Sequence, residues 1–378
     1  MMEPAYPAAR AAAASVHAHF ARHAAAPAAG EGKPASLPDR DAIEAIIDTA
    51  FWASLRHEEG FSPRISLAFV TPAEVERALH FERALPLAAR PLTRLAPAVE
   101  GPGIHLGVWR EREDLRVWGT TRRLPPFCFV LEVVAPGLLV VKQSRGEETG
   151  KFVNVAVLEG EQIKIIDQHA ATLPDCPDLL TSLLGLEARF APDGASNVLI
   201  QIAVSMRAHG RGGLLLVVPA GSDAWRKSII HPVTYSIVPP FSVLADLMQE
   251  DPGERPKRRW QDALRRAVDG IGGVTAVDGA TVITDQYELL AFGAKIVRRP
   301  GSNQVDRVLM TEPIIGAAPE ILEPTQLGGT RHISAAQFEH DQRDAVALVA
   351  SQDGRFTVFA WSPCENMVHA HRIESLLL

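Results

Sequence analysis

The pattern of apolar and polar positions predicts a series of strands between residues 103 and 168. Short apolar or alternating runs are separated there by turn signals rich in Gly, Pro, Asp and Glu. Runs of this length bounded by such residues are typical of strands joined by tight turns. The runs are IHLGVW, LRVWGTT, FCFVLEVV, GLLVVKQ, FVNVAVL and QIKIID. They predict a β-meander.

Helical patterns precede the meander. Residues 41–55 carry apolar side chains near helical spacing, and the segment 64–70 (RISLAFV) predicts a strand. Thr71-Pro72-Ala73-Glu74 is then typical of a capping box with proline at the first helical position, which predicts a helix to about Leu79. These elements with the meander predict an α+β, strand-rich domain over residues 37–190.

The first 36 residues are rich in Ala and Pro. Glu3, Pro4, Pro7 and three histidines interrupt the stretch, so it lacks the compact apolar region of a signal peptide. We expect residues 1–36 to be a disordered tail that holds at most one weak Ala-rich helix. No run approaches the ~18 apolar residues of a membrane span, so we expect no membrane association.

The second half of the chain alternates helical and strand patterns. The run LLLVVP is fully apolar, as in a strand buried on both faces. Apolar residues from Trp260 to Val268 recur at helical spacing, and Gly270 follows as a stop signal. Further strands are predicted at ATVIT, ELLAFGAKI, AVALVAS and RFTVFAW. Residues 191–378 therefore predict an α/β domain, a mixed sheet with helices on both faces and a ligand site at the strand ends.

Composition narrows the class of protein. The 378 residues are too many for one ordinary core, and 47% hydrophobic with 22% charged residues is typical of a globular protein. The formal net charge of −7 argues against nucleic acid as a partner. Three widely spaced cysteines form neither a disulfide framework nor a zinc pattern. Reduced cysteines predict a cytoplasmic protein.

Two short segments carry candidate chemistry. Asp278 and Gly279 stand just before a predicted buried strand, where glycine allows close backbone approach and aspartate can hold a divalent metal. Residues 328–332 (GGTRH) join flexible backbone to a hydroxyl, a guanidinium and an imidazole, which suits phosphate oxygens. Each segment alone is more often a turn. Their order and spacing make the two segments together more informative than either one alone.

These segments and their flanks resemble the diadenylate cyclase (DAC) family. That family has a DGA motif opening a strand and an RHR motif, preceded by Gly-Thr, opening a helix. Here the matching stretches are VDGATVIT, LLAFGAKI and GGTRHISAA. Upstream, residues 212–218 (GGLLLVV) resemble the family's buried strand, and residues 349–354 (VASQDG) resemble its Val-Ser-Glu step. The resemblance covers roughly residues 205–378.

The resemblance implies an enzyme that condenses two ATP molecules into cyclic di-AMP and pyrophosphate. Each domain would bind one ATP with Mg²⁺ or Mn²⁺. Two domains would meet face to face, and the 3′-hydroxyl of each ATP would attack the α-phosphate of the other. A homo-oligomer that associates through this domain is implied. Positioning and charge neutralisation would supply most of the catalysis.

The resemblance also assigns roles to residues. Asp278, Arg331 and His332 are the implied catalytic residues, and Asp278 and His332 are the implied metal ligands. The remaining residues are implied to contact the nucleotide: Gly279, Ala280, Thr330 and Ser351.

Two positions depart from the family. Ile333 replaces the third residue of RHR, and Gln352 replaces the acidic residue after the serine. Asp353, next to Gln352, is a candidate to substitute for that acidic residue. An alternative is therefore a degenerate domain that binds ATP or a cyclic dinucleotide as a signalling module, and a third is a structural protein that keeps only the fold. Arg298 or Arg299 is a candidate for the missing charge.

Two further expectations concern the rest of the chain. The first domain is expected to act as a sensor that controls the second, because DAC modules are commonly joined to a regulatory partner. The sequence does not indicate what this sensor binds. His369 and His371 are candidates for a metal site, but without further ligands at suitable spacing a structural role is expected.

Overall fold

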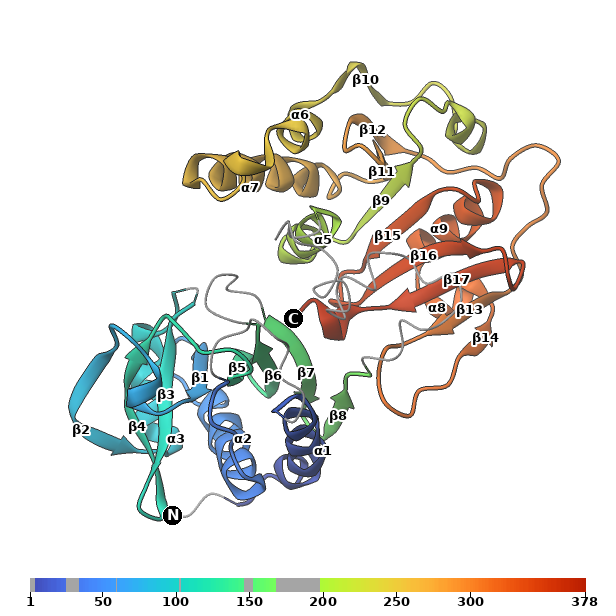
Figure 1. Cartoon of the computed structure of the whole chain (residues 1–378). Coiled ribbons are helices and arrows are strands. Elements are labelled where there is room, and N and C mark those ends of the chain that lie inside the picture. The colour runs from blue at the N-terminus through green and yellow to red at the C-terminus, as the bar shows by residue number, and fades with distance from the viewer. Residues whose placement is uncertain (1–3, 25–33, 59, 102, 146–151, 168–197) are drawn as a thin grey trace. The chain divides into compact units, whose positions relative to one another are not determined.

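The computed structural model describes residues 4–24, 34–58, 60–101, 103–145, 152–167 and 198–378 (Figure 1). The chain divides into two compact units, the first ending at Asp167 and the second ending at Leu377. The expected boundary at residue 190 lies outside the described residues.

A mixed sheet forms the centre of the first unit. Its described strands number eight, in the order β2-β4-β3-β1-β5-β6-β7-β8. β1 runs parallel to β3, and all other neighbours are antiparallel. The strands are β1 (Ile65–Phe69), β2 (Leu79–Pro86), β3 (His105–Glu111), β4 (Asp114–Thr121), β5 (Phe129–Ala135), β6 (Leu138–Ser144), β7 (Phe152–Glu159) and β8 (Gln162–Ile165). The six predicted strands are confirmed as β3 to β8, but only β5 to β8 form a continuous meander, because β1 lies between the β3–β4 hairpin and β5.

Helices cover one face of this sheet. They are α1 (Pro7–Ala24), α2 (Arg40–Ser54) and α3 (Ala89–Leu95), and buried residues of α1 and α2, such as Phe20 and Ile46, belong to one core with the strands. Asp39 caps α2 by accepting a hydrogen bond of 2.8 Å from the Ala42 amide.

The expected Ala-rich helix forms as α1, but the expectation that it is a weak helix in a disordered tail is wrong. Its small or apolar side chains recur on one face and are buried against α2 and the strands. Tyr6, just before the helix, stacks on Phe51 with ring centroids 3.7 Å apart. Alanine composition suggested a weak helix, but alanine also allows close helix packing, and tertiary contacts supply the stability that an isolated helix lacks. The buried residues are Ala8, Ala9, Ala12, Ala13, Val16 and Phe20.

The helix expected after Thr71 is also wrong. The capping box forms between Thr71 and Glu74, but it opens only a short 3₁₀ turn, Pro72–Glu74. Val75 returns to extended backbone, and β2 follows at the edge of the described sheet, paired with β4. A capping box satisfies the amides of a first turn whether or not the turn continues.

The second unit has a larger mixed sheet. Nine described strands lie in the order β10-β12-β11-β9-β15-β16-β17-β13-β14. They are β9 (Gly213–Val218), β10 (Tyr235–Phe241), β11 (Ala280–Thr284), β12 (Leu289–Ala294), β13 (Val308–Thr311), β14 (Glu320–Leu322), β15 (Val346–Ala350), β16 (Phe356–Ser362) and β17 (Met367–Arg372). The five predicted strands are confirmed as β9, β11, β12, β15 and β16, whereas β10, β13, β14 and β17 were not predicted.

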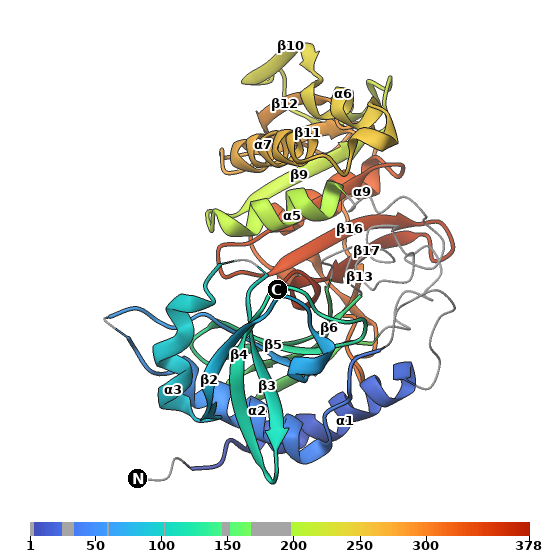
Figure 2. The same ribbon diagram turned by 60° about the vertical axis from the view of Figure 1, so that its left-hand side comes forward.

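Helices pack on both faces of this sheet, as expected (Figure 2). Leu215 and Val217 of β9 share a core with α5 (Val198–Ala208), α6 (Val243–Gln249) and α7 (Arg258–Val274). Alternate residues of the same strand, Leu214 and Leu216, share a core with α9 (Thr330–Asp341) on the other face. The short α8 (Pro324–Leu327) precedes α9. No helix in the described parts of the chain is long and apolar enough to cross a membrane.

Candidate functional site

Several strand ends of the second unit meet at one edge of its sheet. The parallel strands β9 and β11 begin there, with Leu214 paired to Ala280. The antiparallel strands β15 and β12 end there, with Ala350 paired to Gly213 and Ala294 paired to Ala280. The connections that precede β9 and β11 and follow β15 are therefore neighbours, although they are distant in sequence.

A pocket of about 340 Å³ opens beside this edge. The beginning of α9 and the turn between β15 and β16 supply its walls. Four of the predicted site residues line it, Thr330, Arg331, His332 and Ser351, whereas Asp278, Gly279 and Ala280 do not. The other lining residues are Leu327, Gly328, Gly329, Val349, Ala350, Gln352, Asp353 and Arg355.

Gly212 makes room for the guanidinium of Arg331. A Cβ atom on Gly212 would lie 2.9 Å from Arg331 Nη1 and 3.3 Å from the Ala350 carbonyl oxygen. The backbone of Gly212 also has φ of +72°, which favours glycine. The backbone before β9 thus comes close to Arg331, and a side chain at position 212 would require the guanidinium to shift.

Asp278 lies on the turn between α7 and β11. Its carboxylate is exposed and forms an ion pair with Lys295, whose Nζ donates a hydrogen bond of 2.5 Å to Oδ2. This hydrogen bond is the main reason that the pKa of Asp278 lies below its ordinary value, and the charge of Arg331 lowers it further. Asp278 is therefore ionised at neutral pH, and it lies within electrostatic reach of the pocket's arginine.

The turn at Asp278 packs tightly against β12. Gly279 has φ of +113°, and a Cβ atom there would lie 2.6 Å from the carbonyl carbon of Gly293. Gly293 is in turn covered by the ring of Tyr235, which stacks on Phe292 with centroids 4.6 Å apart. Only glycine fits at position 279, so the DGA turn has a backbone reason for its sequence.

His332 is buried at the start of α9. Burial is the main cause that lowers its pKa, and the nearby charges of Arg372, Arg355 and Arg331 lower it further against the opposing effect of Asp353. The imidazole is therefore neutral at neutral pH, which is the form that coordinates a metal ion.

The turn after β15 holds a cation that sequence reasoning missed. Arg355 lines the pocket, and its Nε lies 3.4 Å from Asp353 Oδ2. Asp353 also accepts a hydrogen bond from Ser351 Oγ, which lowers the pKa of the carboxyl group. Gln352 donates a hydrogen bond of 3.3 Å to the Arg211 carbonyl. Only the spacing of Arg355 from Ser351, across a tight Asp-Gly turn, could have signalled it.

Arg299, the candidate for the missing charge, lies elsewhere. Its amide donates a hydrogen bond of 2.8 Å to Asp341 at the last residue of α9. The pocket lies at the first residue of that helix, about 16 Å away at 1.5 Å per residue. Arg299 therefore lies too far from the pocket to compensate for Ile333, whereas Arg355 lines the pocket. The other candidate, Arg298, stays a prediction.

His369 and His371 lie apart from the pocket residues. On β17 they alternate with Val368 and Ala370, which face α9, so the two histidines point to the opposite face from His332. His371 is fully buried, and its Nδ1 lies 2.7 Å from Thr311 Oγ1. This placement fits the expected structural role.

A divalent metal suits this site only in part. In the part of the chain that the structure describes, no group of three or more His, Cys, Asp and Glu side chains is arranged to hold a metal ion. Mg²⁺ commonly needs only one or two carboxylates when phosphate oxygens and water supply the remaining ligands. Asp278 fits that description once Lys295 is displaced.

Comparison with known proteins gives one family match. Residues 32–122 match a family model described as "Probable sensor domain DACNV". No curated protein matches the chain.

Two solved structures are weakly similar. A "hypothetical membrane spanning protein from Bacillus cereus" has 15% identity and a TM-score of 0.28, over 50% of this chain and 70% of that one. DacA from Staphylococcus aureus, crystallised as a double mutant, has 14% identity and a TM-score of 0.23, over 46% of this chain and 83% of that one. TM-scores of this size support no conclusion about the fold or function of this chain. The family match shows that the segment from α2 to β4 in the first unit is similar to a sensor-domain family.

Proposed function

We propose that the second unit is a diadenylate cyclase that condenses two ATP molecules into cyclic di-AMP and two pyrophosphates under control of the first unit. The observation that carries the proposal is the convergence at one sheet edge. Three separate segments meet there: the tight turn at Asp278, the glycine backbone at Gly212 and the pocket around Arg331. Arg331 lies close to Gly212, and its charge lowers the pKa of Asp278.

The pocket suits a triphosphate. Arg331 and Arg355 supply two guanidinium groups, and Thr330 supplies a hydroxyl. α9 begins at Thr330, so its amide groups and the positive end of its dipole lie at the pocket wall. Arginine pairs phosphate oxygens through two parallel hydrogen bonds. Arg355 would supply the positive charge that Ile333 lacks.

Asp278 would hold Mg²⁺ or Mn²⁺, with His332 as a metal or phosphate ligand. The metal would neutralise phosphate charge and acidify the attacking 3′-hydroxyl. The ion pair with Lys295 is exposed, so its loss costs at most about 1 kcal/mol. Lys295, once released, is free to bind phosphate. Gly279 and Ala280 would approach the nucleotide through their backbones.

Two copies would be needed for a cycle. In each half-reaction a 3′-oxygen of one ATP forms a bond to the α-phosphorus of the other, and the bond to pyrophosphate breaks. The side chain of Asp278 is 87% exposed, so it is accessible to a nucleotide held by a second copy. Self-association through the second unit is therefore part of the proposal.

The proposal is tested by ATP binding and product formation in the same samples. With ATP and Mn²⁺, the wild type should gain thermal stability and form cyclic di-AMP. Arg331→Ala should lose both, because phosphate contacts dominate binding. Asp306→Asn is the matched control, since this exposed carboxylate lies outside the pocket and should behave as wild type. Equal behaviour of wild type and Arg331→Ala would contradict the assignment.

The second candidate is a nucleotide-sensing module without synthesis. Ile333 and Gln352 favour it, because each removes a charged group that the resemblance implies. It predicts ATP-dependent stabilisation, of size RT ln(1 + [L]/Kd), with no product. The double substitution Ile333→Arg and Gln352→Glu should then create or sharply raise synthesis. A flat response would place the defect elsewhere in the site.

A further inference from the structure

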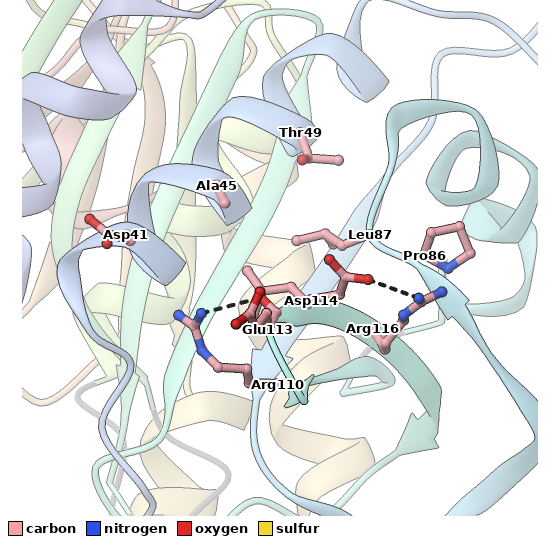
Figure 3. A pocket seen from close by; sticks show the side chains of 10 residues that line it. Asp41, Ala45, Thr49, Pro86, Leu87, Arg110, Glu113, Asp114 and Arg116 are labelled. Atoms are coloured by element: carbon pink, nitrogen blue, oxygen red, sulfur yellow. Dashed lines mark hydrogen bonds and ion pairs between the residues drawn. The ribbon is translucent and has the colours of Figure 1, made fainter.

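The first unit contains a pocket of its own, of about 420 Å³. Asp41, Ala45 and Thr49 line it from one side of α2, and Pro86 and Leu87 line it from the end of β2 (Figure 3). The turn between β3 and β4 supplies the opposite wall, through Arg110, Glu113, Asp114, Leu115 and Arg116. Every lining residue falls within the segment that matches the sensor family, so the pocket belongs wholly to that module.

The two arginines of this pocket are already neutralised. Arg110 Nη2 donates hydrogen bonds of 2.9 Å to both carboxylate oxygens of Asp39, the residue that caps α2. Arg116 Nη2 lies 3.0 Å from Asp114 Oδ2. In the first pair one nitrogen contacts both carboxylate oxygens of Asp39. Both pairs are partly exposed and use a single guanidinium nitrogen, so they weaken the attraction of the arginines for an anion without blocking it.

Two carboxylates at the pocket remain without a cation. Neither Asp41 nor Glu113 takes part in an ion pair among the described residues. With Asp39 and Asp114 they make four carboxylates against two guanidinium groups, a net formal charge of −2. The unmatched charge of the pocket is therefore negative, and it lies on opposite walls, on α2 and on the β3–β4 turn.

The floor of the pocket is apolar. Ala45 on the helix, Leu87 after β2 and Leu115 on β4 are each only partly buried. The amide of Leu87 donates a hydrogen bond of 3.1 Å to the carbonyl of Leu115, which fixes the two walls to each other. A ligand with an apolar body would cover this surface. Each Å² of apolar surface removed from water would favour binding by about 25 cal/mol.

We propose that this pocket is the ligand site of the sensor unit and that it takes a small organic amine, an ammonium group on an apolar body. The ammonium group would lie between Asp41 and Glu113, and the body would rest on Ala45, Leu87 and Leu115. Inorganic cations lack the apolar part, and anions are disfavoured by the excess of carboxylates over guanidinium groups. The inference concerns the first unit alone and holds whether or not the second unit makes cyclic di-AMP.

A matched set of three probes tests the charge. 2-Phenylethylamine, 2-phenylethanol and 3-phenylpropanoate share a ring and a short chain but carry positive, zero and negative charge. Their affinities for the full chain are measured by calorimetry without ATP, so that failure of the cyclase proposal does not affect the result. We expect the amine to bind at least tenfold more tightly than the alcohol, and the carboxylate not to bind. Equal affinities for amine and alcohol would overturn the proposal.

Variants test the location. The double substitution Asp41→Asn and Glu113→Gln should reduce affinity for 2-phenylethylamine at least tenfold while preserving shape. Ala45→Phe should block the floor and abolish binding of both amine and alcohol. The matched control is Glu44→Gln with Glu111→Gln, which removes two charges from the same helix and strand outside the pocket lining. Binding that survives the first double substitution, or that the control weakens equally, would overturn the assignment.

Discussion

The ammonium group of Lys295 donates a hydrogen bond of 2.5 Å to the carboxylate of Asp278. Asp278 stands shortly before β11 and Lys295 directly follows β12, and because these strands are antiparallel the two side chains meet at the edge of the sheet where the pocket opens. Lys295 thus occupies the carboxylate that the proposed mechanism assigns to a metal. The pair keeps Asp278 ionised and poised for exchange of one cation for another.

Removal of Lys295 should separate structure from function. Lys295→Met should change the free energy of unfolding by less than ~1 kcal/mol, because the ion pair is exposed and screened. It should strengthen Mn²⁺ binding in the absence of nucleotide, because the competing cation is gone. Urea unfolding and metal titration by calorimetry measure the two effects. Weaker Mn²⁺ binding in this variant than in the wild type would contradict the competition.

Gly212 gives a test of the close approach to Arg331. Gly212→Ala should lower both stability and ATP affinity, since its Cβ atom would crowd the guanidinium. Gly221→Ala is the matched control, because φ there is +73° against +72° at Gly212, with nothing within 4 Å of the added atom. Both variants should lose about 1 kcal/mol of stability through backbone strain. If the two bind ATP equally well, Arg331 is not positioned by this backbone.

Arg355 should be the second phosphate ligand. Arg355→Ala should weaken ATP binding about tenfold, the expected effect of losing a charge-assisted hydrogen bond. In that background Ile333→Arg should restore part of the affinity, because it returns a guanidinium to the position where the family has one. Thermal shift with ATP measures both. Wild-type affinity in Arg355→Ala would show that Asp353 keeps Arg355 away from the nucleotide.

Buried histidine should make the second unit sensitive to acid. Burial lowers the pKa of His371 to about 3 in the folded chain, against an ordinary value of 6.5. The unfolded state then binds the extra proton between these values, so stability is complete above pH 6.5 and falls as the pH drops toward 3. The loss should reach ~2 kcal/mol at about pH 5.

The acid sensitivity is checked with a variant that cannot titrate. Urea unfolding of the wild type and of His371→Gln at about pH 7.5 and about pH 5 gives, for each protein, the change in the free energy of unfolding with pH. The variant should be less stable near neutral pH, because the Thr311 contact is altered, yet lose less stability on acidification. Parallel slopes would show that another group, such as His332, dominates the effect.

Local patterns predicted most elements but not how they meet. β11, β12 and β15 were readable because their apolar runs are bounded by turns, whereas β17 was missed because His369 and His371 interrupt its apolar pattern. The helix α1 was missed as a packed element because its burial depends on α2 and the strands. These contacts join segments that are distant in the sequence, so no local pattern in residues 7–24 indicates them.

The candidate site shows the same limit. The residues at 278–280 and 328–332 were found from sequence because glycine beside charged residues stands out. Arg355, Lys295 and Gly212 were not assigned to the site, because their relevance comes from strand pairing, which brings them to one sheet edge. Arg299 was expected near the site because it follows a predicted strand, but its amide bonds to Asp341 at the other end of α9, a contact that no local pattern indicates.

The cyclase proposal is tested most directly by incubating the purified 378-residue chain with ATP and Mn²⁺, beside Asp278→Asn, and separating the products by chromatography. We expect cyclic di-AMP with two pyrophosphates per molecule from the wild type and none from the variant. ATP that binds yet yields no cyclic di-AMP in the wild type, or product that persists in Asp278→Asn, would contradict it.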